Sequence, residues 1–312
     1  MPHFIRHLLP TLVLLSLATD VAADDHLLSQ PSPYLARDYV ADDVFGQGIE
    51  GPAVGPDGRL YAVAFGGDGT IGRVAPNPDG SGHAELFVRL PPGSTGNGMR
   101  FGRDGLLYVA DYTGHAILKV NPTTRQVSRF AGDASMHQPN DLALAPDGTM
   151  YASDPDWQHG SGQLWRINRN GHAERLETDM GTTNGIEVSP QGDRLYLNES
   201  VQRQVWVYDL DQAGRISNKR RLIAFTDAGL DGMRCDRDGN LYIARYDAGL
   251  VVVVSPQGQL LHTVQLKGRK PTNLAFGGTD GRQVYVTLQD RGAIETFYSE
   301  IPGRETGQSE QR

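Results

Sequence analysis

Cysteine and the common nucleophile motifs are almost absent from this 312-residue chain. Its one cysteine, Cys235, excludes an intramolecular disulfide, and no histidine lies near it in the sequence. The chain also lacks the Gly-x-Ser-x-Gly motif of serine hydrolases. Beyond the N-terminal segment that holds His3 and His7, no two histidines have the spacing of a metal-binding pair. The sequence therefore gives no support to a serine or cysteine nucleophile or to a histidine-based metal centre.

Long apolar runs are missing as well. The run near the N-terminus covers residues 8–18, whereas a bilayer span needs about 20 residues. Arg6 precedes this run and Val21-Ala22-Ala23 follows it, an order of charged, apolar and small residues that is typical of secretory signal peptides. We expect residues 1–23 to be removed and the protein to be periplasmic or secreted, with no membrane attachment afterwards. An uncleaved anchor or a buried helix is the alternative for this segment.

An excess of positive charge is the third absence. The formal net charge is −8 and the sequence pI is about 5.6. Binding to the phosphates of nucleic acids is therefore not expected. No amphipathic helical pattern is evident, whereas 38 glycines and 18 prolines are typical of a chain with many short strands and turns.

The chain contains a repeat of about 45 residues. Six Asp-Gly or Gln-Gly turns are each followed within a few residues by a tyrosine, and these are Tyr61, Tyr108, Tyr151, Tyr196, Tyr242 and Tyr285. The third repeat shows the pattern well: alternating apolar residues lead to the Asp147-Gly148 turn, and further strands are expected at residues 162–167 and 173–178. Four strands per repeat and six repeats predict an all-β, six-bladed propeller with antiparallel blades.

The domain boundaries follow from this repeat. The sixth repeat ends after its third strand, and residues 34–45 resemble a fourth strand. We expect the strand at residues 37–40 to complete the last blade and close the ring, which leaves no open sheet edge. The prediction is one propeller domain over residues 33–302, followed by a polar flexible tail at 303–312.

An oxygen-bearing side chain recurs 11 or 12 residues before each tyrosine. These side chains, called the column residues below, are Glu50, Asn97, Asn140, Asn184, Asp231 and Asn273. The first strand of each propeller blade lines the central channel, so we expect the column residues to converge there. Carboxylate and amide oxygens without Cys or His suit calcium or magnesium better than zinc or copper. The alternative is that these Asn and Asp residues only make turns, but Glu50 has no such turn chemistry.

Several motifs resemble those of the senescence-marker-protein-30/gluconolactonase/luciferin-regenerating-enzyme family, in particular its microbial gluconolactonase-like branch. They fall in every repeat but the second and include Glu50-Gly51-Pro52, Gln138-Pro139-Asn140-Asp141, Thr183-Asn184-Gly185, Asp231-Gly232-Met233 and Pro271-Thr272-Asn273. The resemblance implies a six-bladed propeller that holds one divalent cation and hydrolyses lactones. The cation is expected to be Ca²⁺, with Mg²⁺, Mn²⁺ and Zn²⁺ as alternatives.

The resemblance also implies roles for individual residues. Glu50, Asn184 and Asp231 match the metal ligands, and Asp231 also matches the acid/base proposed for ring opening. Asn140 matches a substrate contact, and Gln138 and Asp154 are expected beside it in the substrate pocket. Contributions from three further residues are left open, namely Asn97, His137 and Asn273.

Departures from the family keep two alternatives open. Gln138 stands where the animal branch has an arginine, which weakens the case for a sugar-acid lactone. Asn273 stands where the phosphotriesterase branch has a histidine, which favours a lactone over an organophosphate. The expected function is a calcium-type lactonase acting on a small lactone or ester. The alternatives are a phosphotriesterase-type hydrolase and a non-catalytic propeller that binds a ligand or protein. The sequence gives no indication of protein partners.

Overall fold

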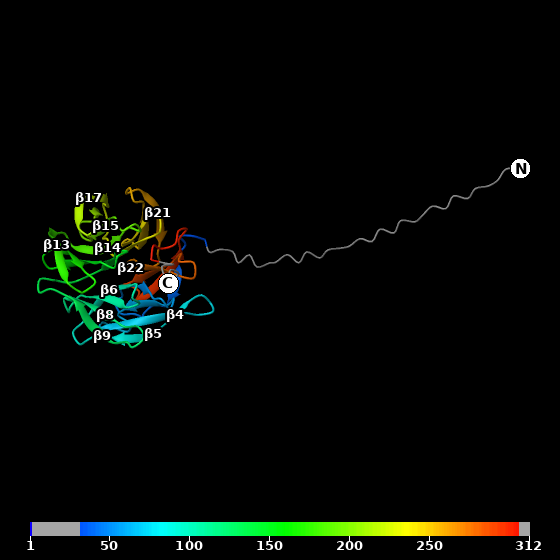
Figure 1. The fold of residues 1–312 in the computed structure, drawn as a ribbon. Helices are drawn as coiled ribbons and strands as arrows, with labels where there is room; N and C mark the ends of the chain where they lie inside the picture. The colour runs from blue at the N-terminus through cyan, green and yellow to red at the C-terminus, as the bar shows by residue number, and fades with distance from the viewer. Residues whose placement is uncertain (2–31, 306–312) are drawn as a thin grey trace. The chain divides into compact units, whose positions relative to one another are not determined.

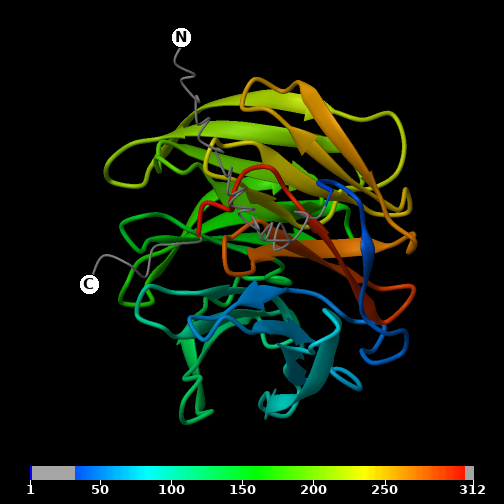
Figure 2. The same cartoon turned by 90° about the vertical axis from the view of Figure 1, so that its right-hand side faces the viewer.

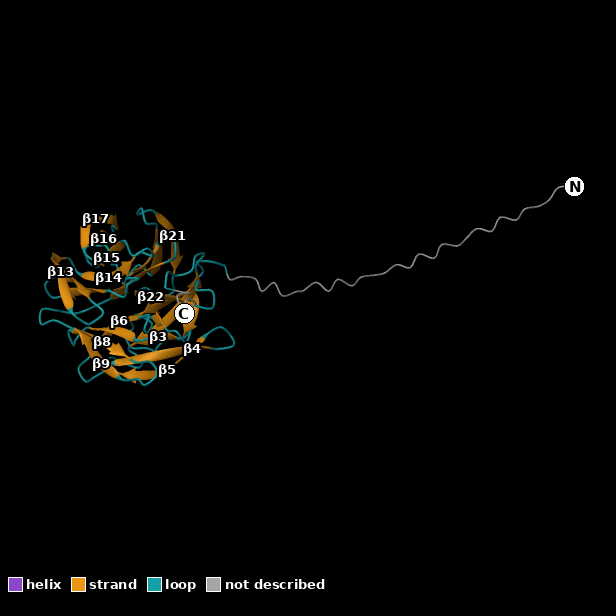
Figure 3. Ribbon diagram, viewed as in Figure 1, coloured by secondary structure: helices purple, strands orange, loops and turns teal. Residues whose placement is uncertain are grey.

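The computed structural model describes Met1 and residues 32–305. Residues 32–305 form six four-stranded antiparallel sheets arranged in a ring, and none of these residues is helical (Figures 1 and 3). The six-bladed propeller predicted from the repeat is therefore confirmed. No described segment has the helical length and apolar character that crossing a bilayer requires. The expected signal peptide at 1–23 lies outside the described residues, apart from Met1.

Each blade contributes its first strand to the centre of the ring. These inner strands are β2 (Ala53–Val54), β6 (Gly96–Phe101), β10 (Leu142–Leu144), β14 (Thr183–Val188), β18 (Met233–Cys235) and β22 (Pro271–Gly277). The second strands are β3 (Leu60–Val63), β7 (Leu107–Asp111), β11 (Met150–Asp156), β15 (Arg194–Glu199), β19 (Leu241–Arg245) and β23 (Gln283–Leu288). The inner strands of neighbouring blades contact one another all the way round, including β22 with β2, so the ring is closed.

The outer half of each blade is more exposed. The third strands are β4 (Thr70–Pro76), β8 (Ala116–Val120), β12 (Ser161–Ile167), β16 (Gln204–Leu210), β20 (Leu250–Val254) and β24 (Ala293–Tyr298). The outermost strands are β5 (Gly82–Arg89), β9 (Val127–Ala131), β13 (Ala173–Met180), β17 (Ile216–Ala224), β21 (Leu260–Gln265) and β1 (Arg37–Val40). All six residues of β14 are buried, whereas most of β17 in the same blade is exposed.

The repeated tyrosines pack between blades. All six are buried. Tyr61 makes an edge contact with Phe101 of the next blade at a ring separation of 5.3 Å, and Tyr242 does the same with Phe276 at 5.0 Å. Such aromatic pairs add about 0.5–1.5 kcal/mol beyond the area that they bury. The tyrosine recurs because each blade presents the same face to its neighbour.

The last blade combines the two ends of the chain. β1 pairs antiparallel with β24, with Arg37 opposite Thr296, and Figure 2 shows the two strands side by side. The predicted ring closure by residues 37–40 is therefore confirmed. The predicted tail begins too early, because Gly303 bridges to Asp236 and Arg304 is buried. Only residues 306–312 of that tail lie outside the described part.

Candidate active site

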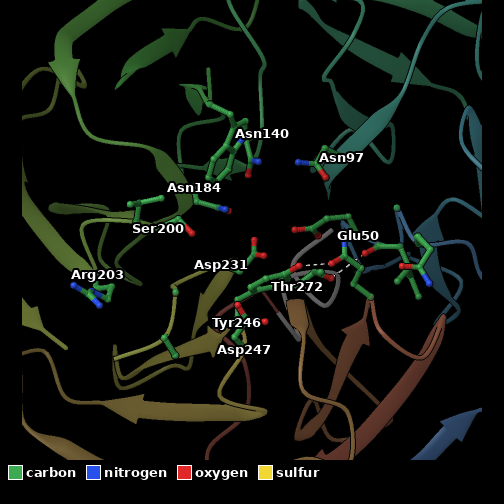
Figure 4. Close-up of a pocket in the computed structure, with 18 residues that line it drawn as sticks. Glu50, Asn97, Asn140, Asn184, Ser200, Arg203, Asp231, Tyr246, Asp247 and Thr272 are labelled. Atoms are coloured by element: carbon green, nitrogen blue, oxygen red, sulfur yellow. Dashed lines mark hydrogen bonds between the residues drawn. The ribbon is translucent and has the colours of Figure 1, made fainter. Parts of the chain in front are cut away.

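Five of the six column residues line one cavity. It measures about 590 Å³ and lies where the inner strands begin. Figure 4 shows Glu50, Asn97, Asn140, Asn184 and Asp231 around it, each from a different blade. They lie at or just before the first residues of β2, β6, β10, β14 and β18. The convergence expected from the sequence is therefore present for the three predicted metal ligands and for Asn140.

Glycines after the column residues allow the inner strands to approach closely. A Cβ added at Gly232 would lie 1.9 Å from Cγ of Asn273, in the next blade. A Cβ added at Gly185 would lie 2.4 Å from the carbonyl oxygen of Asp231. Real Cβ atoms do not approach heavy atoms so closely, so only glycine fits at either position. Each of these two glycines thus leaves room for the column residue of the next blade to lie close to the site.

The two acidic column residues, Glu50 and Asp231, are both buried in the site, and neither forms an ion pair with another described residue. Burial raises the pKa of Glu50 to about 8, and the nearby charge of Asp141 adds to the effect. Burial also raises the pKa of Asp231 well above its ordinary value, and the negative charge of Glu50 adds to it. Two carboxyl groups in such surroundings favour either bound protons or a bound cation.

Two amide oxygens in the cavity have no hydrogen-bond partner among the residues that the structure describes. They are Oδ1 of Asn140 and Oδ1 of Asn184, and both side chains are buried. Buried polar atoms in folded proteins are normally paired, so these two point to a missing ligand. The described residues include no group of three His, Cys, Asp or Glu side chains placed to hold a metal ion, because three of the five column residues in the cavity are amides. Two carboxylates and neutral amide oxygens fit a divalent cation of the calcium type.

The sixth column residue, Asn273, lies behind the cavity. Its Nδ2 donates to Oε1 of Glu50 at 3.4 Å and to Oδ2 of Asp141 at 3.3 Å. The second oxygen of Glu50 accepts from the backbone N–H of Gly51. Both oxygens of Glu50 are thereby fixed in direction. Asn273 therefore supports the site from below without lining it.

A buried ionic cluster, which the sequence analysis missed, lies next to Asn273. Asp141 is fully buried, and its Oδ1 is 3.0 Å from Nη1 of Arg100 while its Oδ2 is 3.2 Å from Nη1 of Arg234. The two guanidinium groups hold the pKa of Asp141 below its ordinary value despite burial. A signal for these residues was present, since Arg100, Glu187 and Arg234 each stand three positions after a column residue in an apolar strand. A charge at such a core position needs a buried partner.

Asp154 and Gln138 were expected in the substrate pocket, but neither lines the cavity. Asp154 is fully buried, and its oxygens accept from the backbone N–H groups of His137 and Gln138 and from Nε1 of Trp165. Oε1 of Gln138 accepts from the N–H of Trp157 at 3.2 Å. These contacts make Asp154 an anchor for the loop that leads to Asn140.

The same anchoring recurs in the neighbouring blades. Asp111 and Glu199 occupy the position of Asp154, three residues after the repeated tyrosine. Asp111 accepts from the N–H of Thr95 at 3.0 Å, and Glu199 accepts from the N–H of Gly181 at 2.9 Å. In three successive blades a carboxylate thus fixes the loop before a column residue. The repeat, rather than any substrate, explains the position of Asp154.

Comparison with known proteins agrees with this geometry. The family model described as the SMP-30/gluconolactonase/LRE-like region matches residues 50–290. The chain belongs to this family. The match runs from Glu50, the first column residue, to beyond Asn273, the last, so the SMP-30/gluconolactonase/LRE-like region contains all six column residues.

Individual relatives in the family include named lactonases. The chain is 30% identical to a gluconolactonase of Zymomonas mobilis over 66% of its own length and 65% of that protein, just under two thirds. It is 29% identical to a pentonolactonase of Haloferax volcanii over 76% of its own length and 80% of that protein. A solved structure of regucalcin from Agrobacterium tumefaciens, called a calcium-binding protein, superposes with a TM-score of 0.73. It has 19% identity and covers 86% of this chain and 95% of that one, which shows a shared fold.

Proposed function

We propose that this protein is a lactonase that uses one divalent cation, calcium in the first instance. The observation that carries the proposal is the set of five oxygen-bearing column residues that line one cavity, two of which have an amide oxygen without a hydrogen-bond partner among the described residues. Glu50, Asn184 and Asp231 would hold the cation, and their two negative charges match its charge. The lactonases among the relatives support a lactone as the substrate.

A bound cation would supply Lewis-acid polarisation of the ester carbonyl and a more acidic water. Asp231 then acts as the acid/base: it takes a proton from water as the new C–O bond forms, and it gives the proton to the ring oxygen as the ring C–O bond breaks. One water is consumed, and the product is a hydroxy acid. Asn140 orients the substrate, because its free Oδ1 can accept a hydrogen bond from a substrate hydroxyl.

A pH-indicator assay tests the proposal directly. The substrates are aldonolactones, acyl-homoserine lactones, aryl esters and aryl phosphates, each assayed with calcium and with EDTA. We expect hydrolysis of at least one lactone with calcium and its loss with EDTA, together with a fall in melting temperature when the metal is removed. Activity on aryl phosphates alone would favour a phosphotriesterase. No activity and no metal response would favour a binding module.

Variants separate the roles of the residues. Asp231→Asn keeps the shape but removes the charge, so we expect it to weaken calcium binding and to abolish turnover. Asn140→Ala should mainly lower kcat/KM. Glu300→Gln makes the same acid-to-amide change at an exposed position and serves as the matched control. Hydrolysis by Asp231→Asn at the parent rate under saturating calcium would contradict the mechanism.

The proposal includes export. The charged, apolar and small-residue order of residues 1–23 supports a mature protein that begins near Asp24. Mass spectrometry of the protein purified from its own cells checks this expectation. A chain that retains residues 1–23 would count against it.

A further inference from the structure

The described end of the chain enters the ring. The N–H of Gly303 donates to the carbonyl of Gly281 at 2.9 Å, and the N–H of Arg304 donates to the carbonyl of Cys235 at 3.1 Å. Arg304 is only 7% exposed. Cys235 is the last residue of inner strand β18, whereas Asp231, two residues before the first residue of that strand, lines the cavity. The segment therefore lies at the end of the channel opposite the cavity.

The Arg304 side chain ties further blades together. Its Nε and Nη2 donate to Oε1 of Glu187 at 2.9 and 2.6 Å, and Nη2 also donates to the carbonyl of Leu144 at 2.9 Å. Leu144 ends the inner strand of the third blade, and Glu187 lies in that of the fourth. Together with the backbone contacts to Cys235 and Gly281, residues 303 and 304 are bonded to four of the six blades.

A series of ion pairs and hydrogen bonds, called the ionic series below, leads from Arg304 to Glu50 in the cavity. Glu305 lies 3.3 Å from Nη2 of Arg304 and 3.8 Å from Nε of Arg100. Arg100 and Arg234 then share Asp141, and Asp141 and Glu50 share the amide of Asn273. Burial and the nearby positive charge of Arg100 lower the pKa of Arg234. Two adjacent buried cations need compensating anions, and the negative charges of Glu187 and Glu305 act on Arg234 in addition to that of Asp141.

We propose that Arg304 is a positioning residue for the metal site, acting from the far end of the channel through this ionic series. It touches neither the cavity nor any column residue. Its effect is to fix Arg100 and Arg234 around Asp141, so that Asp141 and Asn273 hold the carboxylate of Glu50 in one orientation. The inference rests on the proposed function, because it needs a cation at Glu50.

Calcium titration of metal-stripped protein by calorimetry tests this role without an activity assay. Arg304→Met keeps the length of the side chain and removes the charge, and we expect it to raise the Kd for calcium about tenfold, as loss of outer-shell support does at other metal sites. Arg304→Lys keeps the charge but has one nitrogen in place of the two that contact Glu187, so its Kd should lie between those of the parent and Arg304→Met.

The matched control is Arg291→Met. Arg291 contacts Asp38, Asp42 and Glu295 where β1 joins the last blade, and it has no contact with the ionic series. Both methionine variants should lower the melting temperature in EDTA, but only Arg304→Met should raise the calcium Kd. Equal calcium affinity in the parent and both Arg304 variants would overturn the inference. An equal loss of affinity in Arg291→Met would also overturn it.

Two further outcomes are decisive. If Arg304→Met does not fold, Arg304→Lys decides alone, and a Kd equal to that of the parent rejects the inference. A parent protein that binds neither calcium nor magnesium would overturn the proposed metal site and this inference with it. A parent that binds calcium while Arg304 has no influence would overturn only the inference.

Discussion

Asn273 of the last blade donates a hydrogen bond to Glu50 of the first, at 3.4 Å and 223 residues away in the sequence. The contact crosses the position where the ring closes. A parallel contact lies beside it, where Oγ1 of Thr272 donates to the carbonyl of Ile49 at 2.9 Å. The orientation of a predicted metal ligand thus depends directly on closure of the propeller.

Asn273→Ala should weaken both the fold and the metal site. The substitution removes Nδ2 of Asn273, which donates to both Oε1 of Glu50 and Oδ2 of Asp141. Leaving a buried acceptor unpaired costs about 1–3 kcal/mol. We expect a lower melting temperature, measured by calorimetry on the metal-free and the calcium-bound protein. We also expect a higher calcium Kd, measured by calorimetric titration. Asn170→Ala, at an exposed turn, is the control. Unchanged calcium affinity in Asn273→Ala would show that Glu50 is oriented by other contacts.

Calcium binding should strengthen as the pH rises toward 8. Burial raises the pKa of Glu50 from its ordinary 4.5 to about 8, so the metal-free folded protein carries a proton there at neutral pH. The cation must displace that proton, and also any proton on Asp231, whose pKa is raised as well, so calcium affinity should increase as the pH rises toward 8. Calorimetry in two buffers of different ionisation enthalpy counts the protons released. Binding that is independent of pH between 6 and 8 would contradict this prediction.

The raised pKa of Glu50 also determines how the free energy of unfolding of the metal-free protein changes with pH. Between pH 4.5 and about 8 the folded state holds a proton that the unfolded state has lost. The free energy of unfolding of the metal-free protein therefore falls as the pH rises through this range. Saturating calcium should remove this dependence, because the carboxylate is then ionised in both states. Chemical denaturation at several pH values, with calcium and with EDTA, measures both slopes.

Gly232→Ala should disrupt the site by steric overlap. The added Cβ would lie 1.9 Å from Cγ of Asn273, so the inner strands of the fifth and sixth blades must separate. Overpacking of this kind costs about 1–3 kcal/mol. Gly229→Ala places its Cβ in ordinary contact, 3.5 Å from Oγ of Ser200, and should melt like the parent. Equal melting temperatures for the two variants would mean that the strands can separate freely.

Trp157→Ala should change substrate affinity more than turnover. Trp157 lines the cavity from the loop after β11 and is 37% exposed, so part of its ring is available to a bound ligand. Its loss should raise KM with little change in kcat, because it contributes binding that is equal in substrate and transition state. Trp157→Phe should retain most of the affinity. A fall in kcat at constant KM would instead give Trp157 a role in the reaction itself.

The fold could be predicted from the sequence because each repeat corresponds to one blade. The spacing of Tyr61 and its five counterparts predicted the blade number, and the incomplete sixth repeat predicted the pairing of β1 with β24. The column residues were found in the same way. Equivalent positions in a closed ring must converge, whatever their separation along the chain.

What the sequence did not predict lies outside the repeat or depends on pairing between blades. Asp141 and Arg234 are 93 residues apart, and nothing in either segment indicates the other as its partner. Arg304 follows the last repeat, in a segment whose composition is that of an ordinary polar tail. Asp154 does belong to the repeat, but one strand cannot show whether a carboxylate at its end faces a cavity or a backbone loop.

The pairing of β1 with β24 also determines when the protein can become functional. Asp38 and Arg291, which form an ion pair at this junction, are 253 residues apart. At about 5–20 residues per second, a ribosome needs roughly 13–50 s to make the second after the first. Throughout that time the earliest strand has no partner and Glu50 has no Asn273. The nascent chain therefore has no complete site, and a truncated product should have none at any later time.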